Sequence, residues 1–385
     1  MKKEILLSQQ TPMWHFQSDQ EGCCLRATEV KPKLDSFLLK KDRETFSKYR
    51  LNDTNALDYK LSFIALGTKT NYTNSKFPLF FGAGKDLISY EHEIKMSIFS
   101  LHDDLITKMS KYLCEFFATH SFGTRQDKGF GFFYPKDEIQ KIDDKTMADY
   151  GAMYKFTTTK TDFESLFLYI YYFHKLIRSG INESGCYYKS LMYFYAKEKG
   201  FLWDKATIRH HFQLYNDVYR SMCGLQEGKK YLYRESMETE YNECRSRKRL
   251  NILFRDALGL SGRQQWKSYH NTIVISSPEI KRFKSPIIYR PVAIGKSYVV
   301  YIFFDTTSID VIRGKDFTVR SNGGRGQSAP MKMSIYRDFS LEDYFKFIKD
   351  KGLSLLYERK IKNKYVEEIF GNDKNGNPNF TNIKR

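Results

Sequence analysis

The sequence predicts an α+β fold with two domains in tandem, residues 1–148 and 149–371, followed by a disordered tail over 372–385. A chain of 385 residues is long enough for two domains that each bury a core. Apolar residues switch between the strand period of two and the helix period of 3.6 in both halves. The tail is rich in Asn, Gly and Lys and has few apolar residues to bury.

The first domain is predicted to have the element order βαββαβ. Its expected elements are a strand over 4–13, a helix over 25–41, strands over 60–66 and 93–99, a helix over 103–117 and a strand over 131–136. Pro32 should kink the first helix or delay its start. This order is that of the ferredoxin-like (RRM-like) topology, in which one face of the sheet stays open for a ligand.

The second half predicts another RRM-like domain that carries a helical insertion at about 185–265, where glycines separate several helices. The other elements expected there are strands over 152–159, 272–276, 285–292, 298–304, 317–320 and 331–336, and helices over 162–178 and 341–351. The helix over 162–178 is aromatic on almost every side, which predicts that it packs between layers.

The most informative segment is a glycine-rich basic loop, Phe122–Phe132, between the second helix and the last strand of the first domain. Glycine lets a backbone approach a phosphate, cations supply the opposite charge, and an aromatic ring can stack on a base. The candidate RNA-contacting residues are Gly123, Arg125, Lys128, Gly129, Phe130 and Gly131. A plain helix-to-strand turn uses the same residue types, so both interpretations stay open.

The first helix carries a second set of candidate cations, Arg26, Lys31 and Lys33. The seven-residue spacing of Arg26, Lys33 and Lys40 places them near one helix face, where they could follow a phosphate backbone. A solvated helix face would show the same pattern.

The second half offers Arg282, Lys284 and Arg325. Arg282 and Lys284 share a face with Arg290 if strand alternation continues through Pro286. Arg325 belongs to a loop rich in glycine that could hold RNA once ordered. A solvated strand and a disordered hairpin loop are the alternatives, as is a solvated surface for the basic run 245–249.

The net charge of +18 is unevenly distributed. Residues 1–150 contain 22 Lys and Arg against 21 Asp and Glu, whereas the remainder contains 41 against 24. The field that attracts phosphate is therefore expected mainly in the second half. A biased base content of the genome could explain a chain rich in Lys, Tyr and Phe, but not this asymmetry.

The six cysteines form no C-x-x-C pair and no zinc-type spacing with histidine, so we expect no metal and no cofactor. Their scattered positions suit a reducing cytosol. The amino-terminal apolar run is too short for a signal peptide, and no stretch of about 20 apolar residues exists. We expect a soluble cytoplasmic protein without a membrane or small-molecule partner.

Catalytic motifs have little support. Gly295-Lys-Ser297 is similar to the end of a P-loop, but Arg290 occupies the position where that motif requires glycine. A histidine pair beside Arg209, His210-His211, is more typical of a surface or partner-facing helix than of acid–base RNA cleavage.

Three segments together resemble the RAMP superfamily of CRISPR effector complexes: Gly22–Lys33 after the first strand, Gly129–Gly131 before the fourth, and Arg282–Arg290. The last is similar to the R-x-x-S-P-L strand in the second half of two-domain members. Within the superfamily, the chain is most similar to subunit one of the type III-B (Cmr) complex. It departs from the family in having a single glycine between its first strand and first helix.

The resemblance implies a non-catalytic RNA-binding subunit that caps a guide-RNA (crRNA) filament, contacts target RNA and joins other CRISPR effector subunits in antiviral defence. Some RAMP proteins cut RNA with an aspartate in the loop after the first strand. Asp19 is the only aspartate there, and subunit one is not the nuclease of the family. Two alternatives remain: a RAMP-type endoribonuclease that processes repeat RNA, and a stand-alone RAMP-domain scaffold in phage defence.

Overall fold

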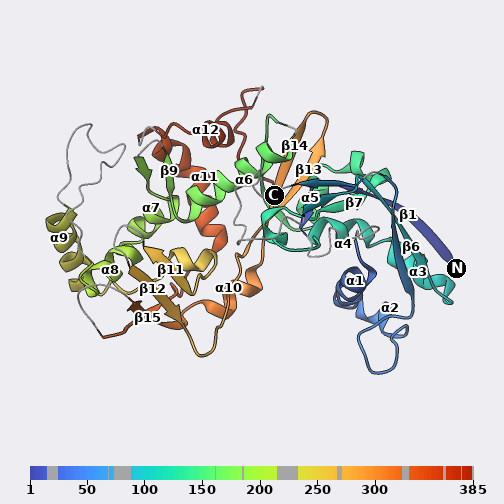
Figure 1. Ribbon diagram of the computed structural model, residues 1–385, viewed down its shortest axis with the longest axis horizontal. Coiled ribbons are helices and arrows are strands. Elements are labelled where there is room, and N and C mark those ends of the chain that lie inside the picture. The colour runs from blue at the N-terminus through green and yellow to red at the C-terminus, as the bar shows by residue number, and fades with distance from the viewer. Residues whose placement is uncertain are drawn as a thin grey trace. The chain divides into compact units, whose positions relative to one another are not determined.

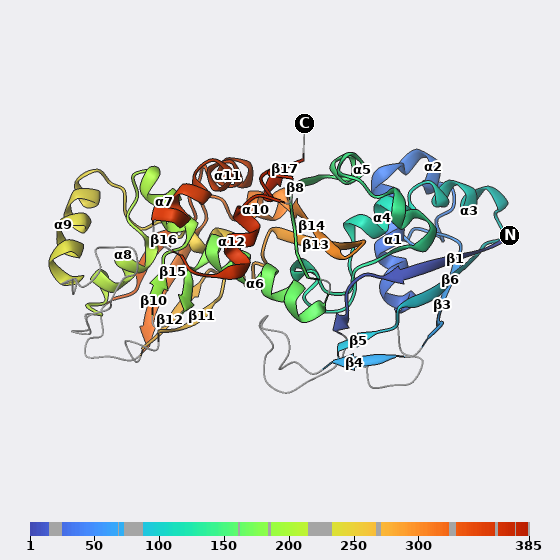
Figure 2. The ribbon, with the colours of Figure 1, turned by 90° about the horizontal axis from the view of Figure 1, so that it is seen from above.

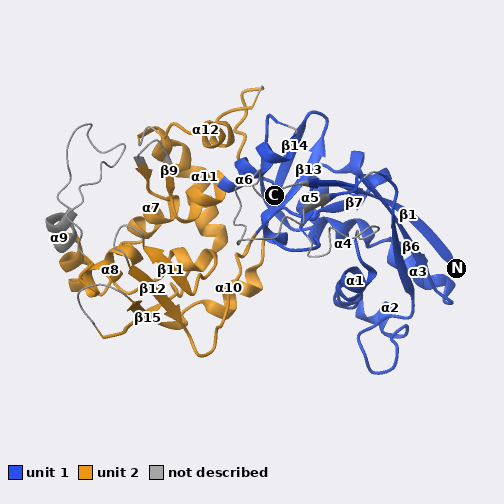
Figure 3. Cartoon of the chain, viewed as in Figure 1, with its two compact units in different colours: residues 1–171, 288–303, 381–385 blue, residues 172–287, 304–380 orange. Residues whose placement is uncertain are grey.

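The computed structural model describes residues 1–14, 25–67, 69–72, 88–160, 162–183, 186–214, 233–266, 271–322, 329–358, 361–373 and 375–383. It is a mixed α+β structure with several antiparallel sheets (Figure 1), and this part of the fold prediction is confirmed. The chain forms two compact units (Figure 3). Unit 1 contains residues 1–171, 288–303 and 381–385, and unit 2 contains residues 172–287 and 304–380.

The first sheet of unit 1 has the spatial order β3-β6-β1-β7, and the strands pair antiparallel. Its strands are β1 (Lys2–Gln9), β3 (Lys60–Ala65), β6 (Glu93–Phe99) and β7 (Phe133–Pro135). The connecting helices are α1 (Ala27–Lys41), α2 (Arg43–Ser47), α3 (Asp103–Ser110) and α4 (Leu113–Thr119), which lie on one side of the sheet (Figure 2). The elements therefore follow one another in the predicted order, with α1 running through Pro32.

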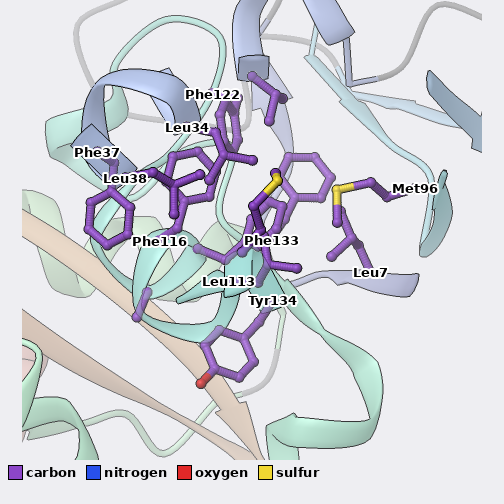
Figure 4. Close-up of a cluster of buried hydrophobic side chains, with 14 of the residues drawn as sticks. Leu7, Leu34, Phe37, Leu38, Met96, Leu113, Phe116, Phe122, Phe133 and Tyr134 are labelled. Carbon is purple, nitrogen blue, oxygen red and sulfur yellow. The ribbon is translucent and has the colours of Figure 1, made fainter. Parts of the chain in front are cut away.

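One face of this sheet forms the core of unit 1 with the helices (Figure 4). Leu7 and Met96 from the strands are buried together with Leu34 from α1 and Phe116 from α4. The alternation predicted for β6 is present, because its even-numbered residues are buried and Phe99 is exposed. The opposite face carries the solvent-facing side chains.

Local boundaries in unit 1 differ from the prediction at two points. The strand expected over 4–13 is divided at Thr11-Pro12 into β1 and β2 (Met13–Trp14), and the helix expected over 103–117 is divided into α3 and α4. An additional sheet has the order β2-β5-β4, with β4 at Thr70–Tyr72 and β5 at Ile88–Tyr90.

The second sheet of unit 1 has the order β13-β14-β8-β17. It contains β8 (Ala152–Thr157), β13 (Ile287–Ile294), β14 (Ser297–Phe304) and β17 (Thr381–Asn382). α5 (Asp144–Asp149) precedes β8, and α6 (Phe163–Arg178) follows it. β8 pairs with β14. Residues 149–171 and 288–303 group with residues 1–148 in unit 1, and the division into domains at residue 148 stays a prediction.

The tail over 372–385, predicted to be disordered, is ordered within its described residues. β17 pairs with β8 within unit 1. In unit 2, Phe380 is buried with its ring centroid 5.5 Å from that of Phe370, and the Asn379 amide donates to the Glu368 carbonyl oxygen at 2.8 Å. One buried aromatic side chain thus anchors a segment whose composition alone favours disorder.

Unit 2 contains a four-stranded antiparallel sheet of order β11-β12-β15-β16 and a β9–β10 hairpin. Its strands are β9 (Ile181–Glu183), β10 (Cys186–Tyr188), β11 (Arg263–Trp266), β12 (Asn271–Ser276), β15 (Asp316–Asn322) and β16 (Met331–Ser334). Its helices are α7 (Leu191–Glu198), α8 (Asp204–His211), α9 (Tyr233–Ser246), α10 (Thr306–Ile312), α11 (Leu341–Glu358) and α12 (Lys364–Phe370).

The strands predicted for a single second domain therefore belong to two different sheets, and the second ferredoxin-like arrangement with its insertion stays a prediction. Among the described residues, no helix is both long and apolar enough to cross a membrane.

Candidate nucleic-acid interface

The glycine-rich loop returns the chain from α4 to β7 within unit 1, and its glycines serve the fold of the loop. Gly123 and Gly131 have φ values of 80° and 65°, in the left-handed region. A Cβ on Gly131 would lie 1.9 Å from the carbonyl oxygen of Phe122, and one on Gly123 would lie 2.5 Å from that of Trp14. Both positions require glycine for close backbone packing.

Four backbone amides of this loop donate to protein carbonyl oxygens, and one of them, Lys128 N–H, donates to Arg125 at 2.9 Å. Phe122 N–H donates to Gly131 at 2.9 Å, Gly131 N–H to Pro12 at 2.9 Å, and Thr124 N–H to Trp14 at 2.8 Å. Satisfied amides do not form the open cradle that a phosphate requires. In this part of the loop, the turn interpretation accounts for the backbone.

Glu29 and Lys33 tether α1 to the loop. The Glu29 carboxylate accepts hydrogen bonds from the Gly123 amide at 2.8 Å and from the Lys33 ammonium at 3.1 Å. Lys33 also donates to the Ser121 carbonyl oxygen at 3.1 Å and lies 4.8 Å from the centre of the Phe122 ring. The Lys33 ammonium is therefore already coordinated by the protein.

Lys31 has a similar structural role at the other side of α1. Its ammonium donates to the Asp35 carboxylate at 2.7 Å and to the Leu57 carbonyl oxygen at 2.8 Å, and it lies 4.1 Å from the centre of the Tyr59 ring. These partners bind Lys31 to the segment that leads into β3.

Lys128, Gly129 and Phe130 are buried in the far part of the loop. Only 6% of Lys128 is exposed, and its ammonium forms an ion pair with Asp127 at 3.2 Å. The Phe130 ring is fully buried and stacks on Phe167 of α6, with ring centroids 3.9 Å apart and planes 10° apart. Phe130 cannot stack on a base in this conformation, because a core aromatic ring occupies that face.

Gly129 completes this buried arrangement. Its φ is 89°, and a Cβ there would lie 3.1 Å from side-chain carbons of Ile170 and Pro291. The residue therefore permits close packing with α6 and β13.

Arg290 supports the loop from β13. Its guanidinium is buried and donates to the carbonyl oxygens of Thr119 at 2.9 Å and Gln126 at 3.0 Å, which flank the start of the loop. Burial lowers the pKa of Arg290 to about 9, with Asp127 acting in the opposite direction. The sequence predicts that Arg290 either contacts phosphate or lies on the solvated side of a strand, and its burial fits neither interpretation.

Arg282 and Lys284 are exposed, unlike Arg290. Strand alternation does not continue through Pro286, because β13 begins at Ile287. Arg282 and Lys284 therefore do not share a strand face with Arg290. Lys284 lies 3.9 Å from the carboxylate of Asp305.

Arg125 and Arg26 have partly exposed side chains, as do Lys31 and Lys33. Arg125 has a φ of 57°, and its guanidinium carbon lies 5.8 Å from the centre of the Trp14 ring. Arg26 is the N-cap residue of the 15-residue helix α1, whose N-terminus carries a partial positive charge. The hydrogen bond between Glu29 and Gly123 joins their two segments.

The remaining candidates are placed as follows. Asp19 and Arg325 lie outside the described residues. His210 stacks on Tyr241, with ring centroids 3.5 Å apart, and His211 Nε2 lies 2.7 Å from the Ala329 carbonyl oxygen. The described residues contain no group of three or more His, Cys, Asp or Glu side chains placed to hold a metal ion.

Sequence reasoning missed Glu29, which accepts hydrogen bonds from both the loop and α1. A usable signal was present, because Glu29 and Lys33 have the i, i+4 spacing that brings side chains together on a helix. The same spacing relates Lys31 to Asp35.

Comparison with protein families matches the Cmr1 N-terminal domain to residues 1–181 and the Cmr1 C-terminal domain to residues 187–375. The search of the curated proteins found no match. Among solved structures, the crystal structure of Cmr1 from Pyrococcus furiosus in its apo form is similar, with 11% sequence identity and a TM-score of 0.40. That similarity covers 91% of this chain and 97% of the other.

Proposed function

The chain belongs to the Cmr1 family, whose members are subunits of type III-B CRISPR complexes, and from this premise we propose that it is a non-catalytic RNA-binding RAMP subunit. The observation that carries the proposal is the match of both Cmr1 domains, one to each half of the chain. In this role the protein caps the guide-RNA filament in the cytoplasm. It contacts crRNA and target RNA, and it joins other Cmr subunits in antiviral defence.

The order β3-β6-β1-β7, with α1 and the α3–α4 pair as connections, supports a ferredoxin-like first domain. For the second domain, the proposal of a ferredoxin-like fold rests on the resemblance of its sequence.

Arg26 and Arg125 are the proposed RNA contacts of the first domain. Arg26 is the N-cap residue of α1, and Arg125 belongs to the loop that Glu29 joins to the first turn of that helix. This helix end attracts anions. Lys31, Lys33 and Lys128 hold the loop and helix in place instead. Specificity comes from base pairing with the guide, and the protein contacts backbone and shape.

The test begins with the complex purified from its native host at moderate salt. A discrete RNA with a common repeat-derived end should co-purify with the protein. A complex that contains this chain but no RNA would contradict the proposal and favour the scaffold alternative. Cleavage of repeat RNA by the purified chain would favour the endoribonuclease.

A double variant, Arg26→Gln with Arg125→Gln, then tests the interface itself. The salt dependence of single-strand RNA binding should weaken by about 1.4 log–log units, since each lost phosphate contact removes roughly 0.7. The matched control is Lys111→Gln with Lys145→Gln, which removes the same charge from exposed positions of the same unit.

A further inference from the structure

The β11-β12-β15-β16 sheet of unit 2 presents three cations on one face. Its register places Arg263 opposite Val274, and Val274 opposite Arg320, so the two arginines flank one valine in a row across three strands. Lys332 lies opposite Thr318, the neighbouring residue of β15 on the same face. Figure 1 shows β11, β12 and β15 side by side.

This face is directed to solvent. On the opposite face the strand residues Ile273, Ile275, Phe317, Val319, Met331 and Met333 are buried and belong to the core. On the outer face Arg263, Arg320 and Lys332 are exposed, and Val274 and Thr318 are half-buried. An antiparallel sheet with one buried and one solvated face has this alternation.

The three cations differ from their neighbours in having no acidic partner. Arg313 and Lys315 form ion pairs with Asp310 and Glu279. Within the described part of unit 2, Arg263, Arg320 and Lys332 form no ion pair, and Arg320 only donates to the Ser276 hydroxyl at 3.3 Å. Asp316 is the one carboxylate among the described strand residues of this face.

The rest of the outer face carries hydroxyl and amide groups. These belong to Gln265, Thr272, Ser276, Thr318, Asn322 and Ser334. They can donate hydrogen bonds to phosphate and sugar oxygens. The described strands place no aromatic side chain there, so the face lacks a platform on which bases could stack.

We propose that this face binds the phosphodiester backbone of RNA independently of sequence, through Arg263, Arg320 and Lys332. Across its whole sequence, unit 2 contains 35 Lys and Arg against 22 Asp and Glu, and this excess attracts a polyanion to it. The inference rests on the proposed function for the identity of that polyanion. It adds a contact surface separate in sequence from α1 and the glycine-rich loop.

The experiment measures binding of a fluorescent 20-nucleotide oligouridine to the full chain by anisotropy, over a series of salt concentrations. The test variant combines Arg263→Gln, Arg320→Gln and Lys332→Gln. The control combines Arg313→Gln, Lys315→Gln and Lys351→Gln, three cations of the same unit that form ion pairs. The test variant should lower the log–log slope by about 2 units if each cation contacts one phosphate, and the control by much less.

A second variant, Thr318→Glu, adds a carboxylate opposite Lys332 while keeping the three cations. It should also lower the slope, and it keeps the proposal testable if the triple variant does not fold, which circular dichroism would reveal.

The outcomes separate the two proposals. One outcome is a slope that is unchanged in the unit 2 variants, although they fold, and reduced in the Arg26/Arg125 variant. This result would contradict the proposed RNA contact surface of unit 2 and leave the proposed function standing. Unchanged slopes in the unit 2 variants and in the Arg26/Arg125 variant would contradict both proposals. If the triple variant binds RNA normally but fails to join the other Cmr subunits, the face binds an acidic protein surface, and the RNA proposal is wrong.

Discussion

The solvent-facing sides of the β3-β6-β1-β7 sheet of unit 1 and the β11-β12-β15-β16 sheet of unit 2 each carry three cations on their described strands. The two faces differ in the partners of those cations. In unit 1, the outer face of the β3-β6-β1-β7 sheet carries Lys2, Lys60 and Lys95. There Glu4 lies 2.7 Å from Lys2 and 3.9 Å from Lys95. In unit 2, the described residues offer no such partner to Arg263, Arg320 or Lys332. If RNA binds the unit 2 face as proposed, we expect the carboxylates around a cation, more than the number of cations, to determine whether phosphate binds there.

Some of the candidates around the glycine-rich loop also have carboxylate partners. Lys31, Lys33 and Lys128 have carboxylate partners within four residues in the sequence and are largely enclosed. Arg26 lies at the N-terminus of α1, and Arg125 lies in the loop joined to the first turn of that helix. We therefore expect substitutions in the first group to change stability, and those in the second group to change RNA affinity.

Gly131→Ala should have the largest effect, a loss of stability. The new Cβ would collide with the Phe122 carbonyl oxygen at a residue with positive φ, so the free energy of unfolding should fall by about 3 kcal/mol or more. Urea denaturation would measure it. Gly295→Ala is the matched control, since that glycine has a φ of 60° but open space around its Cβ, and about 1 kcal/mol is expected. Equal losses in the two variants would show that the loop is not closely packed.

Arg290→Met should have the next largest effect. It leaves the carbonyl oxygens of Thr119 and Gln126 without their buried donor, which predicts a loss of about 2–3 kcal/mol in the free energy of unfolding. Arg282→Met, eight residues earlier in the same motif, is the control, and its exposed side chain predicts a change within about 0.5 kcal/mol. If the Arg290 variant kept full stability but lost RNA binding, Arg290 would be a ligand and not a support of the loop.

His120 gives the loop region a pH dependence. Burial lowers its pKa to about 4 from an ordinary value near 6.5, so below pH 6.5 the unfolded chain binds a proton that the folded chain excludes. Stability attributable to His120 should therefore be complete above pH 6.5 and decrease as the pH falls toward 4, by at most about 1.4 kcal/mol per pH unit. Urea denaturation at pH 7 and pH 5 would show a smaller decrease in His120→Phe than in the parent protein. Equal decreases would assign the pH dependence to other groups.

Periodicity predicted those parts of the structure that depend on local pattern. β6 and α1 were predicted closely because buried side chains recur along them at the strand and helix periods. The pairing of β14 with β8 was not predicted, since no local pattern in residues 297–304 specifies a partner some 140 positions earlier. The burial of Phe130 could not be predicted either. An aromatic residue between two glycines gives the same local pattern whether its ring faces solvent or stacks on Phe167.

The smallest expected effect is on the salt dependence of RNA binding, from a triple variant of the outer face of the unit 1 sheet. Lys2→Gln, Lys60→Gln and Lys95→Gln combined remove as many cations from unit 1 as the test variant removes from unit 2. Glu4 already offsets Lys2 and Lys95, and Leu6, Ile64 and Phe99 interrupt the polar surface between them. The slope of RNA affinity against salt should therefore change by no more than about 0.7 units, the value of one phosphate contact at Lys60. A decrease of about 2 units here would mean that RNA displaces Glu4 from its lysines, and the partner carboxylates would then no longer explain the difference between the faces.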